Sequence, residues 1–208
     1  MTIYRDRADA GRALADRLAG LAGRTDLTVL GLVRGGVPVA AAVAERLAAP
    51  LDVLVVRKLG LPQAPEVAFG ALGPGGVRVL NPELAERLDP DRIAEVVHRE
   101  TVELERREQL YRAGRPPLSL DGRTAVIVDD GLATGATARA SVAVARQLGA
   151  QRVVVAVPVG SVQAYTALAE VADEVVCLQR PEDFGAVSRF YEDFHEVPDE
   201  EVTATLSG

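Results

Sequence analysis

Five short runs rich in valine and leucine alternate along this chain with alanine-rich segments. The runs cover residues 28–33, 51–56, 124–128, 153–159 and 174–178. Because these runs are continuously apolar, they predict strands that are buried on both faces of a sheet. The segments between them, residues 39–48, 137–148 and 161–171, have helical spacing. This alternation predicts βαβ units, and we expect an α/β fold with a doubly wound parallel sheet of about five strands.

Three other segments fall outside this alternation. Residues 6–21 have helical spacing, and we expect this opening helix to pack on the sheet. Residues 67–80 carry a Gly-Pro-Gly-Gly centre between short apolar arms, which predicts a protruding β-hairpin or mobile flap. Asp89 as N-cap, Pro90 in the first turn and Gly114 just beyond the end predict a long helix over residues 90–112.

The predicted long helix has two different faces. One face is a packing stripe formed by Ile93, Val97, Thr101, Leu104 and Tyr111. The other face carries a ladder of alternating charge formed by Glu95, Arg99, Glu103 and Arg107. Each pair in such a ladder contributes only a few tenths of a kcal/mol to helix stability. The simplest interpretation of the ladder is a solvated face, and a subunit contact is the alternative.

Chain length and net charge limit the class of protein. With 208 residues, the chain is long enough for one domain with a substantial core. We expect a single domain over residues 1–208, with its core at about 25–180, a small C-terminal hood at about 181–197 and a frayed tail at 198–208. The net charge of −7 repels polyanions on average, which argues against a nucleic-acid partner.

The sequence carries no signal of a membrane or redox protein. Its apolar runs are much shorter than the roughly 20 residues that span a bilayer. The N-terminal residues MTIYRDRADAGR lack the apolar region of a signal peptide, so we expect a cytoplasmic location. Cys177 is the one cysteine and lies in the apolar stretch EVVCL, where burial is the favoured interpretation.

A small-residue turn between a predicted strand and a predicted helix is the most informative feature. It belongs to the segment VIVDDGLATGAT, residues 126–137. The N-terminus of a helix presents free backbone N–H groups and the positive end of the helix dipole, which together suit a phosphate. Gly131 and Gly135 permit close approach of the backbone, and Thr134 and Thr137 add hydroxyl donors.

Two carboxylates, Asp129 and Asp130, lie at the end of the strand before this turn. A sugar attached to the bound phosphate would extend toward them, and carboxylates accept hydrogen bonds from vicinal hydroxyls. Two other nucleotide-binding motifs are absent, since the sequence has no GxxxxGK[ST] loop and no GxGxxG in the first predicted strand–helix unit. The alternative is a generic strand-to-helix turn with an aspartate cap.

Residues 126–137 resemble the motif by which type I phosphoribosyltransferases bind 5-phosphoribosyl diphosphate (PRPP). In that family the two acids bind the ribose and the TG-x-T turn binds the 5′-phosphate. The resemblance implies a ribose site at Asp129 and Asp130. It implies a phosphate site at Gly131, Leu132, Ala133, Thr134, Gly135, Ala136 and Thr137. Ala136 stands where the family most often has a second glycine, which is a mild departure.

Two further segments fit a diphosphate site. Arg34, Gly35 and Gly36 lie between the first strand and its helix, and they resemble the family's pyrophosphate loop. Arg57 and Lys58 follow the second strand, where the family often carries an Arg-Lys pair. Cations at the carboxyl edge of a parallel sheet face the crevice in which ligands usually bind. Each segment alone also has a purely structural interpretation. Gly35 and Gly36 fit a common Gly-Gly turn before a helix, and Arg57 and Lys58 fit a solvated pair of charges at the end of a strand.

The resemblance also implies the cofactor and the chemistry. Mg²⁺ is expected to arrive with PRPP, near Asp129 and Asp130, and to be held by ligand oxygens rather than by protein groups alone. The sequence has no cluster of histidine, cysteine and carboxylates with metal-ligand spacing. We expect Asp129, Asp130 and Lys58 to take part in catalysis through charge neutralisation and positioning. A homodimer is the family's habit.

The sequence says less about the acceptor. Ala133 stands where the hypoxanthine-guanine branch commonly has an aspartate, so the resemblance disfavours a 6-oxopurine acceptor. The flap, residues 59–77, contains Glu66 as its one charged residue and lacks the lysine and histidine cluster of the orotate enzymes. In the hood, Phe184 and Tyr191 could stack on a base, although such rings more often fill a core. Asp183 is a weaker candidate for contact with a base edge.

We therefore expect an enzyme of the glycosyltransferase class that moves phosphoribosyl from PRPP to a nitrogenous base and releases pyrophosphate. The first alternative is a regulator that senses PRPP or a nucleotide without turnover, which the uncharged flap favours. The second is a hydrolase, in which water takes the place of the acceptor. The resemblance covers most of the chain in the order of its elements, and it extends to predicted bacterial phosphoribosyltransferases with no assigned acceptor.

Overall fold

A five-stranded parallel sheet forms the centre of the molecule. The computed structural model describes residues 2–61 and 64–207. The strand order is β2-β1-β6-β7-β8, and every neighbouring pair is parallel. The strands are β1 (Leu27–Leu32), β2 (Leu51–Leu54), β6 (Thr124–Val128), β7 (Arg152–Val159) and β8 (Glu174–Gln179). The prediction of a doubly wound α/β fold is confirmed, with strand ends within two residues of those expected.

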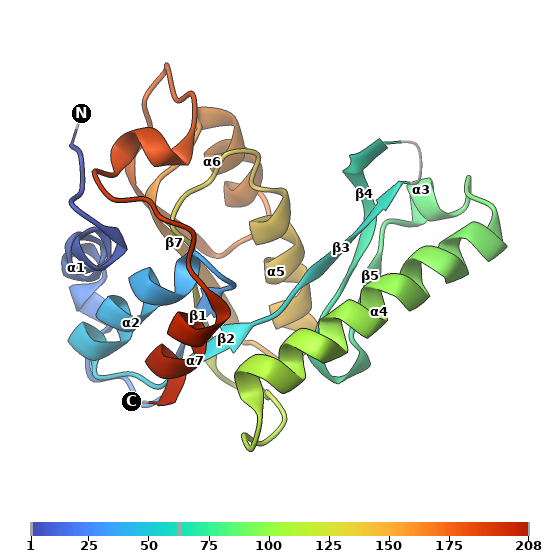
Figure 1. The fold of residues 1–208 in the computed structure, drawn as a ribbon, viewed down its shortest axis with the longest axis horizontal. Helices are drawn as coiled ribbons and strands as arrows, with labels where there is room; N and C mark the ends of the chain where they lie inside the picture. Colours follow the sequence, from blue (N-terminus) through green and yellow to red (C-terminus); the bar gives the residue numbers. More distant parts are fainter. Residues whose placement is uncertain (1, 62–63, 208) are drawn as a thin grey trace.

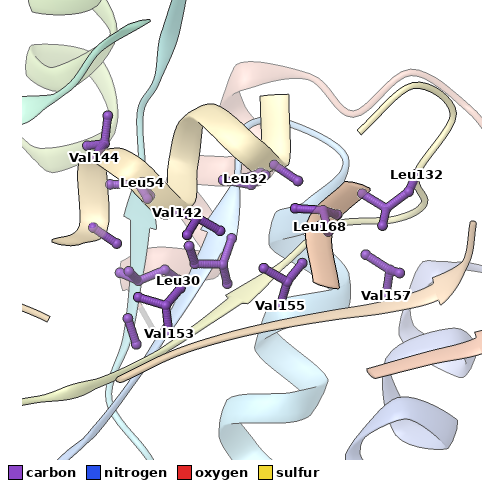
Figure 2. Packing of buried hydrophobic residues seen from close by; sticks show 14 of the residues in the cluster. Leu30, Leu32, Leu54, Leu132, Val142, Val144, Val153, Val155, Val157 and Leu168 are labelled. Carbon is purple, nitrogen blue, oxygen red and sulfur yellow. The ribbon is translucent and has the colours of Figure 1, made fainter. Parts of the chain in front are cut away.

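Helices cover both faces of this sheet (Figure 1). On one face lie α1 (Arg7–Arg17) and α2 (Gly36–Leu47), and on the other lie α5 (Ala136–Gln147) and α6 (Val162–Ala169). Successive residues of β6 alternate between the two cores, because Val126 and Val128 pack with α1 and α2 whereas Ile127 packs with α5. Figure 2 shows the second core, where Val142 of α5 meets Val153 and Val155 of β7. Continuous apolar runs are the consequence of burial on both sides.

An arm extends from one edge of the sheet. It contains an antiparallel sheet of order β3-β4-β5, formed by β3 (Arg57–Leu61), β4 (Ala64–Leu72) and β5 (Arg78–Leu80). A short 3₁₀ turn, Pro74–Gly76, joins β4 to β5, so the predicted hairpin is confirmed. The strand β3 was not predicted, and residues 62–63 of the flap lie outside the described residues.

The helix α4 (Pro90–Arg112) runs along this small sheet, as the green ribbon of Figure 1 shows. Its bounds match the prediction, and the Asp89 carboxylate accepts from the backbone N–H groups of Asp91 and Arg92 at 2.9 and 3.3 Å. At its far end, Arg112 donates to both carboxylate oxygens of Asp52 at 3.0 Å. This buried pair fixes α4 to β2. Short α3 (Pro82–Ala85) precedes it.

The C-terminal segment differs from the prediction of a frayed tail. Residues Asp199–Ser207 form the helix α7, which buries Val202 and Leu206 in the core beside α2 and α4. The hydroxyl of Tyr111 on α4 donates to Asp199 at 2.5 Å. The apolar residues of α7 are spaced four apart and cover one face, and this burial outweighs the acidic, threonine-rich composition of the segment. Within the described residues, no helix is both long and apolar enough to cross a membrane.

Candidate functional site

The turn after β6 has the glycine N-cap and the exposed threonines on which the phosphate-site prediction rests. We use the name phosphate loop for residues 131–137. Gly135, with a φ of 72°, is the N-cap of α5, a left-handed conformation that glycine adopts without strain. Thr134 and Thr137 are exposed beside it. The first N–H groups of α5 therefore point out of the helix next to two accessible hydroxyls.

Leu132 has a structural role in this loop. Its side chain is buried in the core between α5, α6 and the sheet. Its backbone N–H donates to the carbonyl of Val159 and its carbonyl accepts from Ser161, each at 2.9 Å. The Ser161 hydroxyl donates to the carbonyl of Ala133 at 2.8 Å. The connection from β7 to α6 thus holds the phosphate loop, whereas the side chains of Ala133, Thr134 and Thr137 stay exposed.

Asp129 and Asp130 lie side by side at the end of β6, as predicted. One carboxylate oxygen of Asp129 accepts from the backbone N–H of Asp130 at 2.9 Å. Burial raises the pKa of both carboxyls, and the neighbouring charge of Asp130 raises the pKa of Asp129 further. Two carboxylates in this position can accept hydrogen bonds from a pair of vicinal hydroxyls.

Arg7 holds the second of these acids, which the sequence analysis did not foresee. Its Nε donates to Asp130 at 2.9 Å, and its Nη1 donates to the carbonyl of His195 at 2.8 Å. The guanidinium also lies 4.0 Å from the centre of the Phe194 ring. The attraction of Arg7 lowers the pKa of Asp130, against the larger effect of burial. Arg7 starts α1, so the first helix, β6 and the C-terminal segment meet at this carboxylate.

The predicted pyrophosphate loop reaches the aspartates. A Cβ added to Gly35 would overlap a carboxylate oxygen of Asp130, and one added to Gly36 would lie 2.5 Å from the carbonyl of Val128. Only glycine permits this approach. The Arg34 side chain forms an ion pair with Glu196 and lies 3.8 Å from Asp199 of α7. The loop is therefore beside Asp130, while the Arg34 side chain contacts the C-terminal segment.

Arg57 and Lys58 begin β3 of the arm rather than end β2, which corrects their predicted place on the parallel sheet. The reason is that the chain leaves the parallel sheet after Leu54 and pairs with β4. Both Nε and Nη2 of Arg57 donate to one oxygen of Glu100 on α4, at 2.9 and 2.7 Å. Lys58 lines the same cavity as Arg57.

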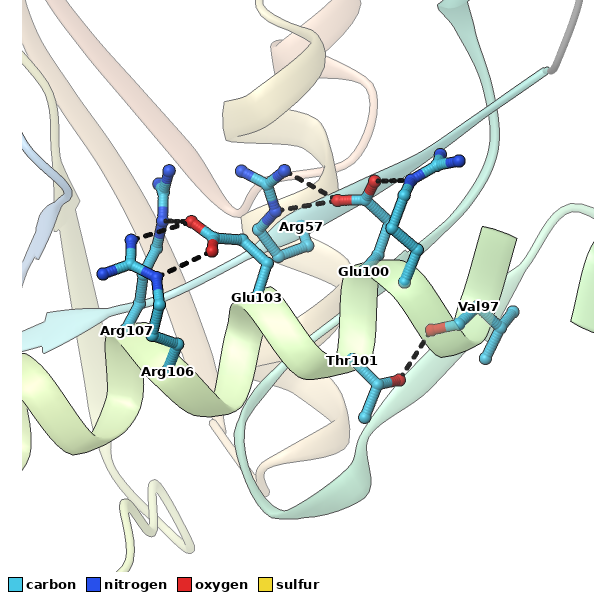
Figure 3. A network of polar contacts seen from close by, with 8 residues as sticks. Arg57, Val97, Glu100, Thr101, Glu103, Arg106 and Arg107 are labelled. Carbon is cyan, nitrogen blue, oxygen red and sulfur yellow. Dashed lines mark hydrogen bonds and ion pairs between the residues drawn. The ribbon is translucent and has the colours of Figure 1, made fainter. Parts of the chain in front are cut away.

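A cavity of about 760 Å³ lies between the phosphate loop and the arm. It is lined by Val33, which precedes the pyrophosphate loop, by Thr137, by Arg57 and Lys58 of β3, and by Arg92, Glu95, Arg99, Glu100 and Arg107 of α4. Glu95, Arg99 and Arg107 of the charged ladder therefore border this cavity, while Glu95 and Arg99 remain exposed to solvent as the simplest interpretation predicts. Figure 3 shows Glu100 and Glu103 on the Arg57 side of α4, opposite Thr101 and Val97.

The residues of the hood that were candidates for binding the acceptor do not line this cavity. Phe184 and Tyr191 are buried in a cluster with Tyr4 and Phe190, and the Tyr191 hydroxyl donates to the backbone carbonyl of Asp130 at 2.6 Å. Among the described residues, neither ring offers a free face to a ligand, because hydrophobic burial has drawn both into the core. Asp183 is exposed and lies 3.6 Å from Arg189.

The chain is similar to known proteins over most of its length. A family model described as a phosphoribosyl transferase domain matches residues 2–195. A Mycobacterium tuberculosis (strain ATCC 25618 / H37Rv) protein named "Putative phosphoribosyl transferase Rv0571c" is 53% identical over 208 residues, which cover 99% of this chain and 47% of that protein. The chain thus spans about half the length of this curated relative.

A solved structure extends the likeness to the fold. The crystal structure of TT1426 from Thermus thermophilus has a TM-score of 0.91 and 48% sequence identity, and the match covers 99% of this chain and 98% of that chain. The family model also spans the phosphate loop, the two aspartates and the pyrophosphate loop. The chain therefore belongs to the phosphoribosyl transferase domain family.

Proposed function

We propose that this chain is a pentosyltransferase that moves 5-phosphoribosyl from PRPP to a ring nitrogen of a heterocyclic base and releases pyrophosphate. One observation carries the proposal. The phosphate loop, the two aspartates and the pyrophosphate loop meet at one edge of the parallel sheet, with Gly35 packed against the Asp130 carboxylate. That arrangement matches a ligand with a phosphate at one end, a diol in the middle and a diphosphate at the other end.

Each part of PRPP has a complementary group. The 5′-phosphate accepts from backbone N–H groups at the start of α5 and from the Thr134 and Thr137 hydroxyls. The ribose 2′- and 3′-hydroxyls donate to Asp129 and Asp130. The diphosphate binds at Gly35 and Gly36, with Arg57 and Lys58 available to neutralise it.

The proposed reaction exchanges one bond at C1 of the ribose. The bond from C1 to the pyrophosphate oxygen breaks with its electron pair, the acceptor nitrogen forms a new bond to C1, and the proton of that nitrogen is lost to solvent or to the departing pyrophosphate. Positive charge develops on the ribose, so Asp129 and Asp130 stabilise the transition state electrostatically while they hold the sugar. Arg57 and Lys58 stabilise the charge that gathers on the leaving group.

Magnesium fits this site as a component of the substrate. Carboxylate, phosphate and hydroxyl oxygens are the ligands that Mg²⁺ prefers, and the paired acids at the end of β6 are compatible with such an ion beside the ribose. When bound, Mg²⁺ supplies charge neutralisation of the diphosphate. The protein groups of this chain position the sugar and shield the reacting carbon from water.

The acceptor is expected to be other than a 6-oxopurine. Ala133, exposed on the phosphate loop, offers a methyl group where an acid could exchange a proton with the base. Adenine and orotate are therefore better first choices in a panel than hypoxanthine or guanine.

A pyrophosphate-release assay tests the proposal directly. The protein is incubated with PRPP, Mg²⁺ and one base at a time, and we expect release that depends on one base and on Asp129 and Asp130. Release without any base would favour hydrolysis. Binding of PRPP in calorimetry with no release for any base would favour a sensor of PRPP or nucleotides. Failure to bind PRPP would contradict the transferase and a sensor of PRPP.

A further inference from the structure

The cavity beside the phosphate loop is lined on one side by a helix that sequence reasoning left outside the site. Of the described residues that line it, five are basic and two are acidic. The basic residues are Arg57, Lys58, Arg92, Arg99 and Arg107, and the acidic residues are Glu95 and Glu100. Three of the five cations belong to α4. This excess of positive charge faces Thr137 of the phosphate loop and Val33, which precedes the pyrophosphate loop.

Two acids on this face of α4 are each shared by two guanidiniums (Figure 3). Glu103 accepts from Arg107 at 2.6 Å and from Arg106 at 2.8 Å. Glu100 accepts from Arg57 and, through its other oxygen, from Arg99 at 3.1 Å. Because one carboxylate cannot neutralise two guanidiniums, each group retains positive charge that a further anion can balance.

Glu103 is ionised at any ordinary pH. Hydrogen bonds from Arg106 and then Arg107 lower the pKa of Glu103 to about 2. In contrast, the flap cannot supply cations to the cavity. Residues 59–77 contain a single charged residue, Glu66, and it is an acid. A ligand whose diphosphate enters this cavity must therefore find its positive charge on β3 and α4.

We propose that α4 forms the cationic wall that closes on the diphosphate of PRPP, with Arg99 and Arg107 as diphosphate-binding residues and Glu100 as the residue that orients Arg57. The inference rests on the function proposed above and adds a binding role for a helix outside the phosphate and pyrophosphate loops. The helix α4 thereby supplies the positive charge that the flap, residues 59–77, lacks.

The chain offers a matched pair of variants. Arg107 and Arg106 both bind Glu103, but of these two only Arg107 is among the described residues that line the cavity. Arg107→Gln and Arg106→Gln each remove one of the two guanidiniums from Glu103, so their effects on α4 itself are similar. Arg99→Gln is a second test at a side chain with 66% exposure, where folding is not at risk.

Calorimetry with three probes tests the inference. We titrate pyrophosphate, ribose 5-phosphate and PRPP, each with Mg²⁺, into the wild type and the three variants. We expect Arg107→Gln and Arg99→Gln to weaken pyrophosphate and PRPP by about tenfold, as the loss of a charge-assisted hydrogen bond implies. Ribose 5-phosphate affinity should stay within about twofold of the wild type, and Arg106→Gln should match the wild type for all three probes.

Two results would overturn the inference while leaving the proposed function in place. One is equal affinity of all four proteins for pyrophosphate and PRPP. The other is an equal loss for all three probes in Arg107→Gln and Arg99→Gln, which would place these arginines away from the diphosphate. If the wild type binds none of the probes, the proposed function itself fails.

Discussion

Arg7 and Asp130 form an ion pair across 123 residues of sequence, with Nε and the carboxylate oxygen 2.9 Å apart. Only 8% of the arginine side chain and 15% of the aspartate side chain are exposed. The pair joins the start of α1 to the second proposed ribose-binding acid. Because a buried carboxylate without a partner tends to take up a proton, Arg7 favours the ionised form that accepts hydrogen bonds.

Replacement of Arg7 by glutamine should damage both stability and binding. Removal of one partner from a buried ion pair leaves an uncompensated charge, so we expect a loss of about 3 kcal/mol in the free energy of unfolding. PRPP affinity should fall with it, and Arg7→Lys should restore part of the affinity. Arg5→Gln, which removes an exposed pair with Asp9, is the control and should cost less than about 1 kcal/mol. Equal behaviour of Arg7→Gln and Arg5→Gln in urea denaturation would contradict this role.

Replacement of Asp129 by asparagine should raise stability and reduce binding. The folded state raises the pKa of Asp129, so it binds this proton more tightly than the unfolded chain does. The stabilisation from this proton is therefore complete below the ordinary pKa near 4 and is lost as the pH rises through the raised value.

Asparagine is uncharged at every pH and can still accept from the backbone N–H of Asp130. At pH 7 we expect Asp129→Asn to melt above the wild type, by about 2–4 °C per kcal/mol regained, and the difference should shrink toward pH 4. PRPP affinity at pH 7 should decrease. A variant that melts below the wild type at pH 7 would show that the buried carboxyl of Asp129 does not destabilise the folded state.

Gly35→Ala should disrupt the contact between the pyrophosphate loop and the aspartates. The added Cβ would overlap an Asp130 oxygen, so either the loop or the carboxylate must move. We expect pyrophosphate affinity to fall at least about tenfold, because the backbone donors lose their position. Gly20→Ala is the matched control, since nothing lies within 4 Å of its added Cβ. Unchanged affinity in Gly35→Ala would exclude a close approach at this position.

Leu206→Ala tests whether α7 is part of the fold. Leu206 is 7% exposed and packs in the core with Tyr111 and Leu104 of α4. Loss of its buried side chain should cost about 2 kcal/mol or more in the free energy of unfolding. Glu200→Ala, at an exposed position of the same helix, should change this free energy by less than about 0.5 kcal/mol. A frayed terminus would instead make the two variants alike.

Local signals explain what the sequence predicts well. The bounds of α4 follow from Asp89, Pro90 and Gly114, which act within one turn of the helix ends. The strand β6 and the phosphate loop follow from a continuous apolar run and a glycine at the helix start. These features depend on neighbours in sequence, so one sequence suffices to find them.

Features that depend on distant partners could not be predicted. Nothing near Arg7 in the sequence indicates that its partner is Asp130, and the ladder of α4 has the same pattern whether it faces solvent or a cavity. The same limit applies to Phe184 and Tyr191, since residues far away in the sequence, among them Tyr4 and Val159, pack with them. Tertiary contacts decide these cases.

The most direct test of the account is a crystal structure of this chain with PRPP and Mg²⁺. We predict that the 5′-phosphate lies within hydrogen-bond distance of the backbone N–H groups of residues 134–137, and that the ribose hydroxyls donate to Asp129 and Asp130. PRPP bound at another place, or a phosphate loop closed by protein with both acids directed away from the sugar, would contradict it.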